Sequence, residues 1–201
     1  MTPQALADLI AASAAKTKGR FIAALAGPPA AGKSTLAAEL AALIGTGAKV
    51  VPMDGFHYDD AVLIARGARD RKGAPDTFDA QGFFHLLRRL KTESEVAIPL
   101  FDRALEISRA GADIVGPQDK ILIVEGNYLL LNEAPWPQAL PLYDLTIWID
   151  VDESALITRL MQRWASYGKT EAEARAWIEG NDLPNIRRVV KGSGRADVVI
   201  S

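Results

Sequence analysis

The sequence predicts an α/β fold with a central parallel β-sheet of about five strands. Short, almost purely apolar runs recur along the chain, as expected for strands buried on both faces of a sheet. Segments with the apolar spacing of helices separate these runs, and this alternation is typical of a parallel sheet covered by helices. With 201 residues the chain is long enough for one domain with a substantial core, and two would be cramped. We therefore predict a single domain over residues 1–201.

The predicted elements alternate from the first residues onward. An amphipathic helix over residues 3–16 precedes a strand over 21–26, which is followed by a helix over 33–43 and a strand over 50–53. Asp79 suits the N-cap of a further helix, because its side chain can accept hydrogen bonds from the first free N–H groups. The remaining predicted elements are a surface loop over 66–77, strands over 121–124, 145–149 and 196–200, and helices over 155–164 and 171–179.

The amino-acid composition excludes several classes of function. The chain has no cysteine, which excludes disulfides, thiolate nucleophiles and cysteine-bound metals. Its formal charge is -2 with acids and bases interspersed, and this argues against nucleic acid as a partner. No apolar run approaches the ~20 residues of a membrane span, and the N-terminus has no signal-peptide pattern. We expect a cytoplasmic protein without a membrane or nucleic-acid partner.

A glycine-rich segment between the first strand and the second helix predicts a phosphate site. Residues 27–34 read G-P-P-A-A-G-K-S and match G-x-x-x-x-G-K-[ST] in the strand–loop–helix context that this motif requires. The glycines let successive N–H groups point at one anion, and the helix dipole adds positive charge. Lys33 would reach the β- and γ-phosphates of ATP, and Ser34 would bind Mg²⁺. The candidate cofactor residues are Gly27, Pro28, Ala30, Ala31, Gly32, Lys33, Ser34 and Thr35.

Two carboxylates follow predicted strands and favour phosphoryl transfer. The sequence has no N-K-x-D segment of a GTPase and no L-S-G-G signature of a transporter ATPase, and the charged residues at the strand ends favour a small-molecule kinase. Asp54 and Glu125 each follow a strand, so both should emerge at the carboxyl edge of the sheet beside the phosphate site. One carboxylate would take the proton of an acceptor hydroxyl and the other would hold Mg²⁺. The alternative is that each only caps a turn after its strand.

Several further segments extend the pattern and together resemble a known family. The chain is similar to the P-loop kinases that include uridine kinase, bacterial pantothenate kinase and phosphoribulokinase, in particular a bacterial branch with names such as fructokinase or nucleoside kinase. The segments that carry this resemblance are Gly27–Ser34, D-G-F-H at 54–57, K-G-A-P at 72–75 with Phe78 and Asp79, P-L-F-D at 99–102, V-E-G-N-Y at 124–128 and R-A-D-V-V-I at 195–200.

This resemblance implies a fold and several residue roles. The fold would be the P-loop NTPase three-layer sandwich with a helical lid over about residues 159–190, and the cofactors would be ATP and Mg²⁺. Asp54 would be the catalytic base, and Glu125 would belong to the magnesium or acceptor site. Arg195 lies where relatives pack the adenine, although it would equally suit a plain surface position. Relatives are often dimers or tetramers, so the resemblance allows a homodimer.

The predicted lid carries candidate catalytic and binding residues. Arg159 and Arg163 are four apart and share a helix face, from which they could neutralise the transferring phosphoryl group, unless that face is simply solvated. Arg159 has the stronger case, because Ile157–Leu160 resembles the lid start of pantothenate kinase. Asn181 and Asn185 could face the nucleotide or the acceptor, or residues 180–185 could be a turn that ends the preceding helix.

The acceptor is less well specified by the sequence. Uridine kinases place an Asp where this chain has Gly73, and they carry a His that is missing after Asp102, so a nucleoside is disfavoured. The histidine and tyrosine of pantothenate kinase after its central loop are also missing. Carboxylates and arginines together suit a hydroxyl-rich ligand, which slightly favours a sugar such as fructose. A nucleoside or pantothenate-type kinase and a regulatory ATP-binding switch without turnover remain the alternatives. The candidate acceptor residues are His57, Asp102, Arg103, Glu106 and Arg109, with Asn181 and Asn185; His57 alone could also be purely structural.

Overall fold

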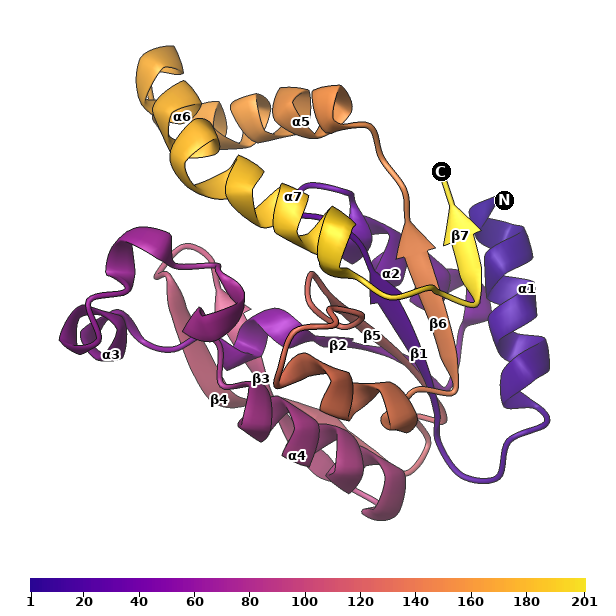
Figure 1. Cartoon of the computed structure of the whole chain (residues 1–201). Helices are drawn as coiled ribbons and strands as arrows, with labels where there is room; N and C mark the ends of the chain where they lie inside the picture. The colour runs from indigo at the N-terminus through magenta and orange to yellow at the C-terminus, as the bar shows by residue number, and fades with distance from the viewer.

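A five-stranded parallel sheet forms the centre of the protein, and the computed structural model describes residues 1–201. The strand order is β2-β5-β1-β6-β7, and every neighbouring pair is parallel (Figure 1). β1 lies in the middle and is buried at all six positions, as its unbroken apolar run predicts. The predicted α/β fold is therefore confirmed. The strands are β1 (Phe21–Ala26), β2 (Ala48–Pro52), β5 (Ile121–Gly126), β6 (Leu145–Ile149) and β7 (Val198–Ile200).

Helices cover both faces of the sheet and make it the middle of three layers. α1 (Pro3–Ala14) and α2 (Lys33–Ile44) pack on one face, where Ile10 and Leu40 are fully buried. The other face is covered by α4 (Ala80–Thr92) and the 3₁₀ segment η4 (Trp136–Leu142), which contribute to a second apolar cluster. The Asp79 side chain accepts from the Gly82 N–H, so it caps α4 as predicted. None of the helices is both long and apolar enough to span a membrane.

A helical lid rises from the carboxyl edge of the sheet between β6 and β7. It consists of α5 (Glu153–Ser166), α6 (Glu171–Trp177), the π-helical turn η5 (Ile178–Asp182) and α7 (Leu183–Gly192) (Figure 1). The predicted alternative of a turn over 180–185 is wrong, because the chain stays helical there. Pro184 has no N–H to donate to the preceding turn, and it directly follows the π-helical turn, where the regular hydrogen-bond pattern is already shifted.

A second group of elements lies outside the predicted helices and strands. β3 (Val96–Asp102) and β4 (Ile107–Val115) form an antiparallel hairpin outside the main sheet, with a register shift between Ile98 and Leu100. The short helix α3 (Asp60–Ala65) lies near the hairpin, at the left of Figure 1. Between the sheet and this region lie the 3₁₀ turns η1 (Met53–Phe56), η2 (Arg69–Arg71) and η3 (Pro75–Thr77). Together these segments form the side of the molecule opposite the lid across the site described below.

Candidate active site

The glycine-rich loop curls tightly between β1 and α2. Ala30 has φ of 62° and Gly32 has φ of 92°, and both values lie in the left-handed region. Gly32 is also the N-cap of α2, and its missing Cβ makes that conformation free of strain. Alternation of left- and right-handed residues turns successive backbone N–H groups toward one concave side. The loop therefore has the geometry of an anion cradle at a helix N-terminus.

Lys33 folds back over this cradle. Its ammonium donates to the Pro28 carbonyl over 2.9 Å, and the residue is buried. Burial lowers the pKa of Lys33 to about 8, although the negative charges of Glu125 and Asp54 oppose this shift. A positive charge with few water contacts is therefore held beside the N–H groups, where a phosphate chain would accept its hydrogen bonds.

Asp54 and Glu125 meet beside the cradle because their strands are neighbours. Glu125 pairs with Pro52 of β2 on one side and with Leu25 of β1 on the other, so it lies between the segment leading to Asp54 and the segment leading to the cradle. Its carboxylate accepts a hydrogen bond from the Ser34 hydroxyl over 3.1 Å. The predicted convergence at the carboxyl edge of the sheet is therefore present in the structure.

The two carboxylates differ in their electrostatic surroundings. Burial raises the pKa of Glu125, and the negative charge of Asp54 raises it further. Burial also acts to raise the pKa of Asp54, but the positive charges of His57, Arg103 and Lys33 outweigh it and leave this pKa below its usual value. Neighbouring acids with pKa values pushed apart are a common arrangement in active sites. Asp54 is thus the more readily ionised of the pair.

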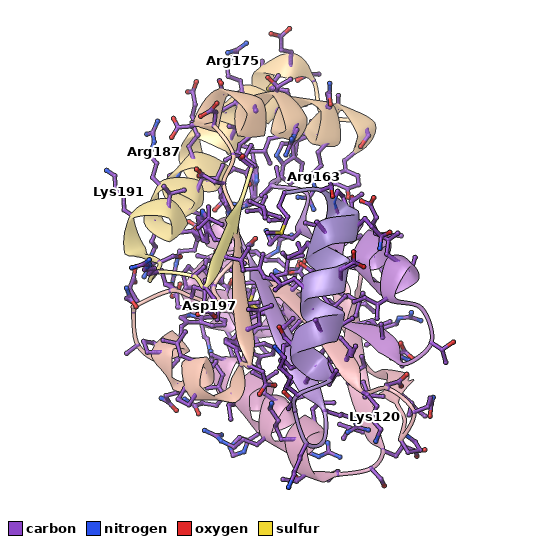
Figure 2. The ribbon with its side chains drawn as sticks, turned by 90° about the vertical axis from the view of Figure 1, so that its right-hand side faces the viewer. Lys120, Arg163, Arg175, Arg187, Lys191 and Asp197 are labelled. Carbon is purple, nitrogen blue, oxygen red and sulfur yellow. The ribbon has the colours of Figure 1, made fainter.

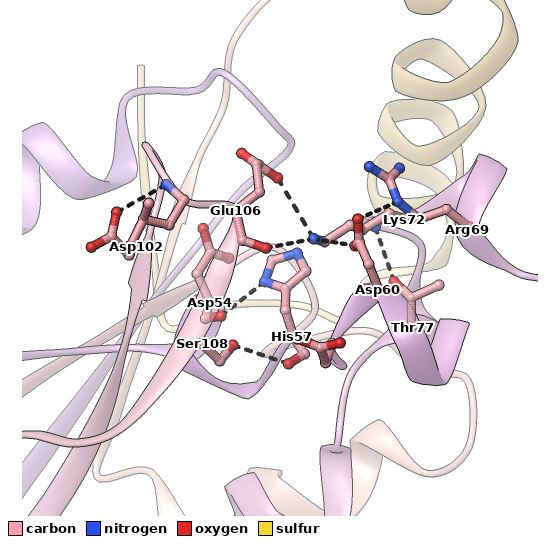
Figure 3. A network of polar contacts seen from close by, with 12 residues as sticks. Asp54, His57, Asp60, Arg69, Lys72, Thr77, Asp102, Glu106 and Ser108 are labelled. Carbon is pink, nitrogen blue, oxygen red and sulfur yellow. Dashed lines mark hydrogen bonds and ion pairs between the residues drawn. The ribbon is translucent and has the colours of Figure 1, made fainter. Parts of the chain in front are cut away.

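Asp54 is held against the β3–β4 hairpin. Its Oδ2 accepts from Nη2 of Arg103, which lies in the turn between β3 and β4. Gly55 permits this approach, since a Cβ at that position would clash with the backbone carbonyl of Pro99. The His57 Nδ1 lies 2.8 Å from the Asp54 carbonyl oxygen, and Ser108 donates to the His57 carbonyl over 3.0 Å (Figure 3).

The lid contributes two arginines from α5. Arg159 Nη1 donates to the carbonyls of Ala30 and Ala31, each over 3.2 Å, and so connects the lid to the cradle. Arg163 lies one turn further along the same helix, beneath α5 on the side that faces the body of the protein (Figure 2). Arg175 and Arg187, by contrast, project outward from the lid. Arg159 is exposed to solvent yet bonded to the cradle, and Arg163 is half-buried, so these two side chains differ from those on the outer side of the lid.

One cavity of about 760 Å³ unites these groups. Cradle residues line one end, Asp54 and Glu125 line its floor, and the lid and the hairpin turn line the remaining walls. Only five of its 25 lining residues are hydrophobic, so polar and charged side chains are available to a ligand on most sides. The predicted site residues that line the cavity are Ala30, Gly32, Lys33, Ser34, Thr35, Asp54, His57, Arg103, Glu106, Glu125, Arg159, Arg163, Asn181 and Asn185.

Comparison with known proteins decides the family to which this site belongs. The model of the phosphoribulokinase / uridine kinase family matches residues 22–201, which leaves out little more than α1. The chain belongs to this family. It is accordingly an ATP-dependent kinase, a phosphotransferase that uses an alcohol group as acceptor.

Individual relatives of this kinase cover most of its length. A candidate uridine kinase of Schizosaccharomyces pombe is 39% identical over 198 residues, covering 92% of this chain and 84% of its own. A pantothenate kinase of Enterococcus faecalis is 28% identical over 208 residues, covering 90% and 68% respectively. The crystal structure of a candidate fructose transport system kinase from Silicibacter sp. TM1040 matches with a TM-score of 0.96 and 42% identity over 100% of both chains.

Several predicted residues of this kinase lie outside the main cavity. Gly27, Pro28 and Ala31 form the back of the cradle, with Pro28 accepting from Lys33. Asp102 and Arg109 lie 3.6 Å apart between Oδ2 and Nε on the hairpin, and the Arg109 side chain is 56% exposed. Arg195 is exposed and lines neither this cavity nor the second one.

Other lining residues of the kinase were absent from the sequence prediction. Asn127 follows Glu125 by two positions and could have been found from its place at the end of β5. Lys72 belongs to the K-G-A-P segment, yet nothing in that segment indicates its contacts. Trp164, Tyr167, Lys169, Trp177 and Asp182 come from the lid, and only the folding of α5 to α7 over the site brings them together.

A second, smaller cavity of about 260 Å³ adjoins the cradle. It shares Gly32 and Arg159 with the main cavity, and seven of its 11 lining residues are hydrophobic. Its walls come from both ends of the chain: Met1, Pro3 and Leu6 at the N-terminus, and Ile200 and Ser201 at the C-terminus.

Proposed function

We propose that this kinase transfers the γ-phosphoryl group of ATP, bound with Mg²⁺, to a hydroxyl group of a small sugar or a similar polyol. The observation that carries the proposal is the single polar cavity in which the cradle, Asp54 and a wall of hydrogen-bonding side chains face one another. A donor and an acceptor can therefore be held together, which supplies much of the catalysis of phosphoryl transfer.

In the proposed reaction Asp54 accepts the proton of the acceptor hydroxyl. The freed oxygen forms a bond to the γ-phosphorus as the bond to the β–γ bridging oxygen breaks, and the electron pair leaves with ADP. Lys33, Arg159 and Arg163 supply positive charge to the oxygens of the transferring group. The pKa of Asp54 lies below its usual value, so the carboxylate is ionised at neutral pH and has a free lone pair for the proton.

The residues at the cradle fit a magnesium ion. The Ser34 hydroxyl and the Glu125 carboxylate supply neighbouring oxygen ligands, which Mg²⁺ prefers, together with phosphate oxygens and water. A bound Mg²⁺ would neutralise developing phosphate charge and would favour the ionised form of Glu125, whose pKa burial raises. We therefore propose Glu125 as a ligand of the metal rather than a contact of the acceptor.

The second cavity supports a place for the adenine of ATP. It opens beside Gly32, and its apolar walls suit a planar base. We expect the base there, in contact with Leu36 and Val151, rather than beside Arg195.

The acceptor side of the main cavity favours a hydroxyl-rich compound. Arg103, Glu106, Asn181 and Asn185 offer both donors and acceptors, which hydroxyl groups need. The 42%-identical relative described as a candidate fructose transport system kinase favours a sugar. A nucleoside is the second candidate, because Trp164 and Tyr167 line the cavity and could stack on a base.

The test is acceptor-dependent release of ADP. Sugars, nucleosides and pantothenate are each added to the enzyme with Mg²⁺ and ATP, and the product is identified by mass spectrometry. We expect a sugar to give the highest kcat/KM. A nucleoside or pantothenate as the best acceptor would overturn the sugar assignment, and ATP binding without ADP release under every acceptor would instead support a regulatory switch.

A further inference from the structure

We propose that Arg103 gates the base: it holds the Asp54 carboxylate until an acceptor draws the guanidinium away, and it thereby suppresses hydrolysis of ATP by water. The proposal rests on the function proposed above, since it takes Asp54 as the proton acceptor. The observation that carries it is the ion pair between Nη2 of Arg103 and Oδ2 of Asp54 inside the reaction cavity.

The ion pair occupies an oxygen that the reaction needs. A carboxylate oxygen that accepts from a guanidinium is less basic and less accessible to a new O–H donor. The Arg103 side chain is 44% exposed, so solvent or a ligand can reach the guanidinium, although the Asp54 side chain is only 20% exposed. An acceptor whose hydroxyl oxygens bind Arg103 would free Asp54 at the moment that its own O–H arrives.

The hairpin turn holds Arg103 by contacts that do not involve its side chain. The Asp102 carboxylate accepts from two backbone N–H groups of the turn, over 3.1 and 3.2 Å. Glu106, at the end of the turn, has φ of 57°, a left-handed value that residues other than glycine rarely adopt. Its carbonyl accepts from the Lys72 ammonium over 2.9 Å (Figure 3). These bonds should keep the turn in place when the Arg103 side chain is shortened.

Lys72 connects the turn to two other walls of the cavity. Its side chain is only 7% exposed, and its ammonium also binds Asp60 of α3 over 2.7 Å (Figure 3). Its backbone carbonyl accepts from Asn181 of the lid over 3.4 Å. The hairpin turn, the loop after α3 and the lid therefore meet at one residue, so an acceptor that moves any of them is in a position to disturb the Arg103–Asp54 pair.

The gate matters because water can replace the acceptor. A water oxygen would attack the γ-phosphorus, its proton would pass to Asp54, and the bond to the β–γ bridging oxygen would break to leave ADP and phosphate. Coupling the release of the base to acceptor binding is a form of induced fit, in which the correct substrate completes the catalytic site. With Arg103 in place, the base is free chiefly when an acceptor is bound.

The test measures phosphate release from ATP and Mg²⁺ with no acceptor present. We expect Arg103→Met to hydrolyse ATP faster than the wild type by roughly tenfold or more, which is a part of the roughly 10²- to 10⁴-fold that a positioned base contributes. The double variant Asp54→Asn/Arg103→Met should lose this gain. Arg103→Lys, which keeps a positive charge, should lie between the wild type and Arg103→Met. Arg88→Met on the exposed face of α4 is the matched control and should behave as the wild type.

Two results would overturn the gate. One is hydrolysis by Arg103→Met at or below the wild-type rate, and the other is a gain that survives in the double variant. Circular dichroism and ATP affinity show whether each variant is folded. Because the assay contains no acceptor, a failure of sugars as substrates would overturn the proposed acceptor class and leave the hydrolysis comparison valid.

Discussion

The Ser34 hydroxyl donates to the Glu125 carboxylate over 3.1 Å, although the two residues are 91 positions apart in the chain. Ser34 lies in the first turn of α2 and Glu125 lies in β5, so this bond joins the phosphate cradle to the strand beside it. The oxygen atoms of both proposed magnesium ligands therefore lie side by side at the edge of the cradle.

We predict that Glu125→Gln will weaken the use of magnesium more than the binding of nucleotide. The amide keeps the size of the side chain and removes its charge, so the apparent affinity for Mg²⁺ should fall by roughly 10- to 100-fold. Titration of kinase activity with Mg²⁺ at saturating ATP measures this change. Glu171→Gln on the exposed face of α6 is the control. An unaltered Mg²⁺ dependence would remove Glu125 from the metal site.

Asp54→Asn should abolish most phosphoryl transfer and leave the protein able to bind ATP. Loss of a general base lowers kcat by roughly 10²- to 10⁴-fold, whereas the cradle and Lys33 are untouched. Steady-state kinetics with the best acceptor and calorimetry with ATP separate the two effects. Undiminished turnover would exclude Asp54 as the base; Asp8→Asn on α1 controls for a general effect of removing a carboxylate.

ATP affinity should decrease as the pH rises through about 8, the pKa to which burial lowers Lys33. The protonated ammonium attracts the phosphates, so below this pH Lys33 is charged and affinity is at its plateau. Above it, free Lys33 is mostly neutral and must take up a proton on binding, which weakens affinity by up to about tenfold per pH unit.

Calorimetry between about pH 7 and about pH 9, in buffers of different ionisation enthalpy, measures both the affinity and the proton uptake. Lys33→Arg stays charged throughout this range and should show a flat pH profile, even if its affinity is lower. A flat profile for the wild type would contradict the prediction.

Arg20→Met should destabilise the fold without altering the site. Arg20 is buried, and its guanidinium donates to five backbone carbonyls from the end of α4 and the segment before β5: Leu90, Glu93, Ser94, Gly116 and Asp119. Methionine would leave these acceptors without a donor, at a cost of about 3 kcal/mol or more in the free energy of unfolding.

Urea unfolding followed by circular dichroism measures this cost. Arg88→Met, which removes an exposed arginine from α4, should change the free energy of unfolding by no more than about 0.5 kcal/mol. A decrease of only this size in the free energy of unfolding of Arg20→Met would show that other groups donate to these carbonyls when Arg20 is absent. Activity per folded molecule should equal that of the wild type in both variants.

The phosphate cradle and the main sheet could be predicted from sequence because both depend on local patterns. The backbone of residues 27–34 is shaped by its own glycines and by the helix that starts at Lys33. Each strand of the sheet is a short apolar run, and parallel strands place their carboxyl ends at one edge. These two patterns were sufficient to predict that Asp54 and Glu125 lie beside the cradle, and the structure places them there.

The hairpin over residues 96–115 escaped prediction, and with it the main contact of Asp54. β3 is largely apolar but contains Pro99, which argues against an interior strand, and most of β4 is not buried and has no clear apolar pattern. The lid was predicted only in part for a related reason. Residues 180–185 contain glycine and asparagine, which are common in turns, but packing keeps them helical because Leu183 and Ile186 are buried against the body of the protein.

Local residue patterns are enough to predict the donor half of this kinase: an α/β sheet, a phosphate cradle and two carboxylates at its edge. The surroundings of the acceptor depend on packing between distant segments, namely which arginine holds Asp54, which lid side chains line the cavity and which predicted residues stay outside it. The two halves differ in how far apart in the chain their residues lie. The cradle is built from backbone conformations within a few residues, whereas the acceptor wall is built from side chains that meet only after the hairpin and the lid have packed.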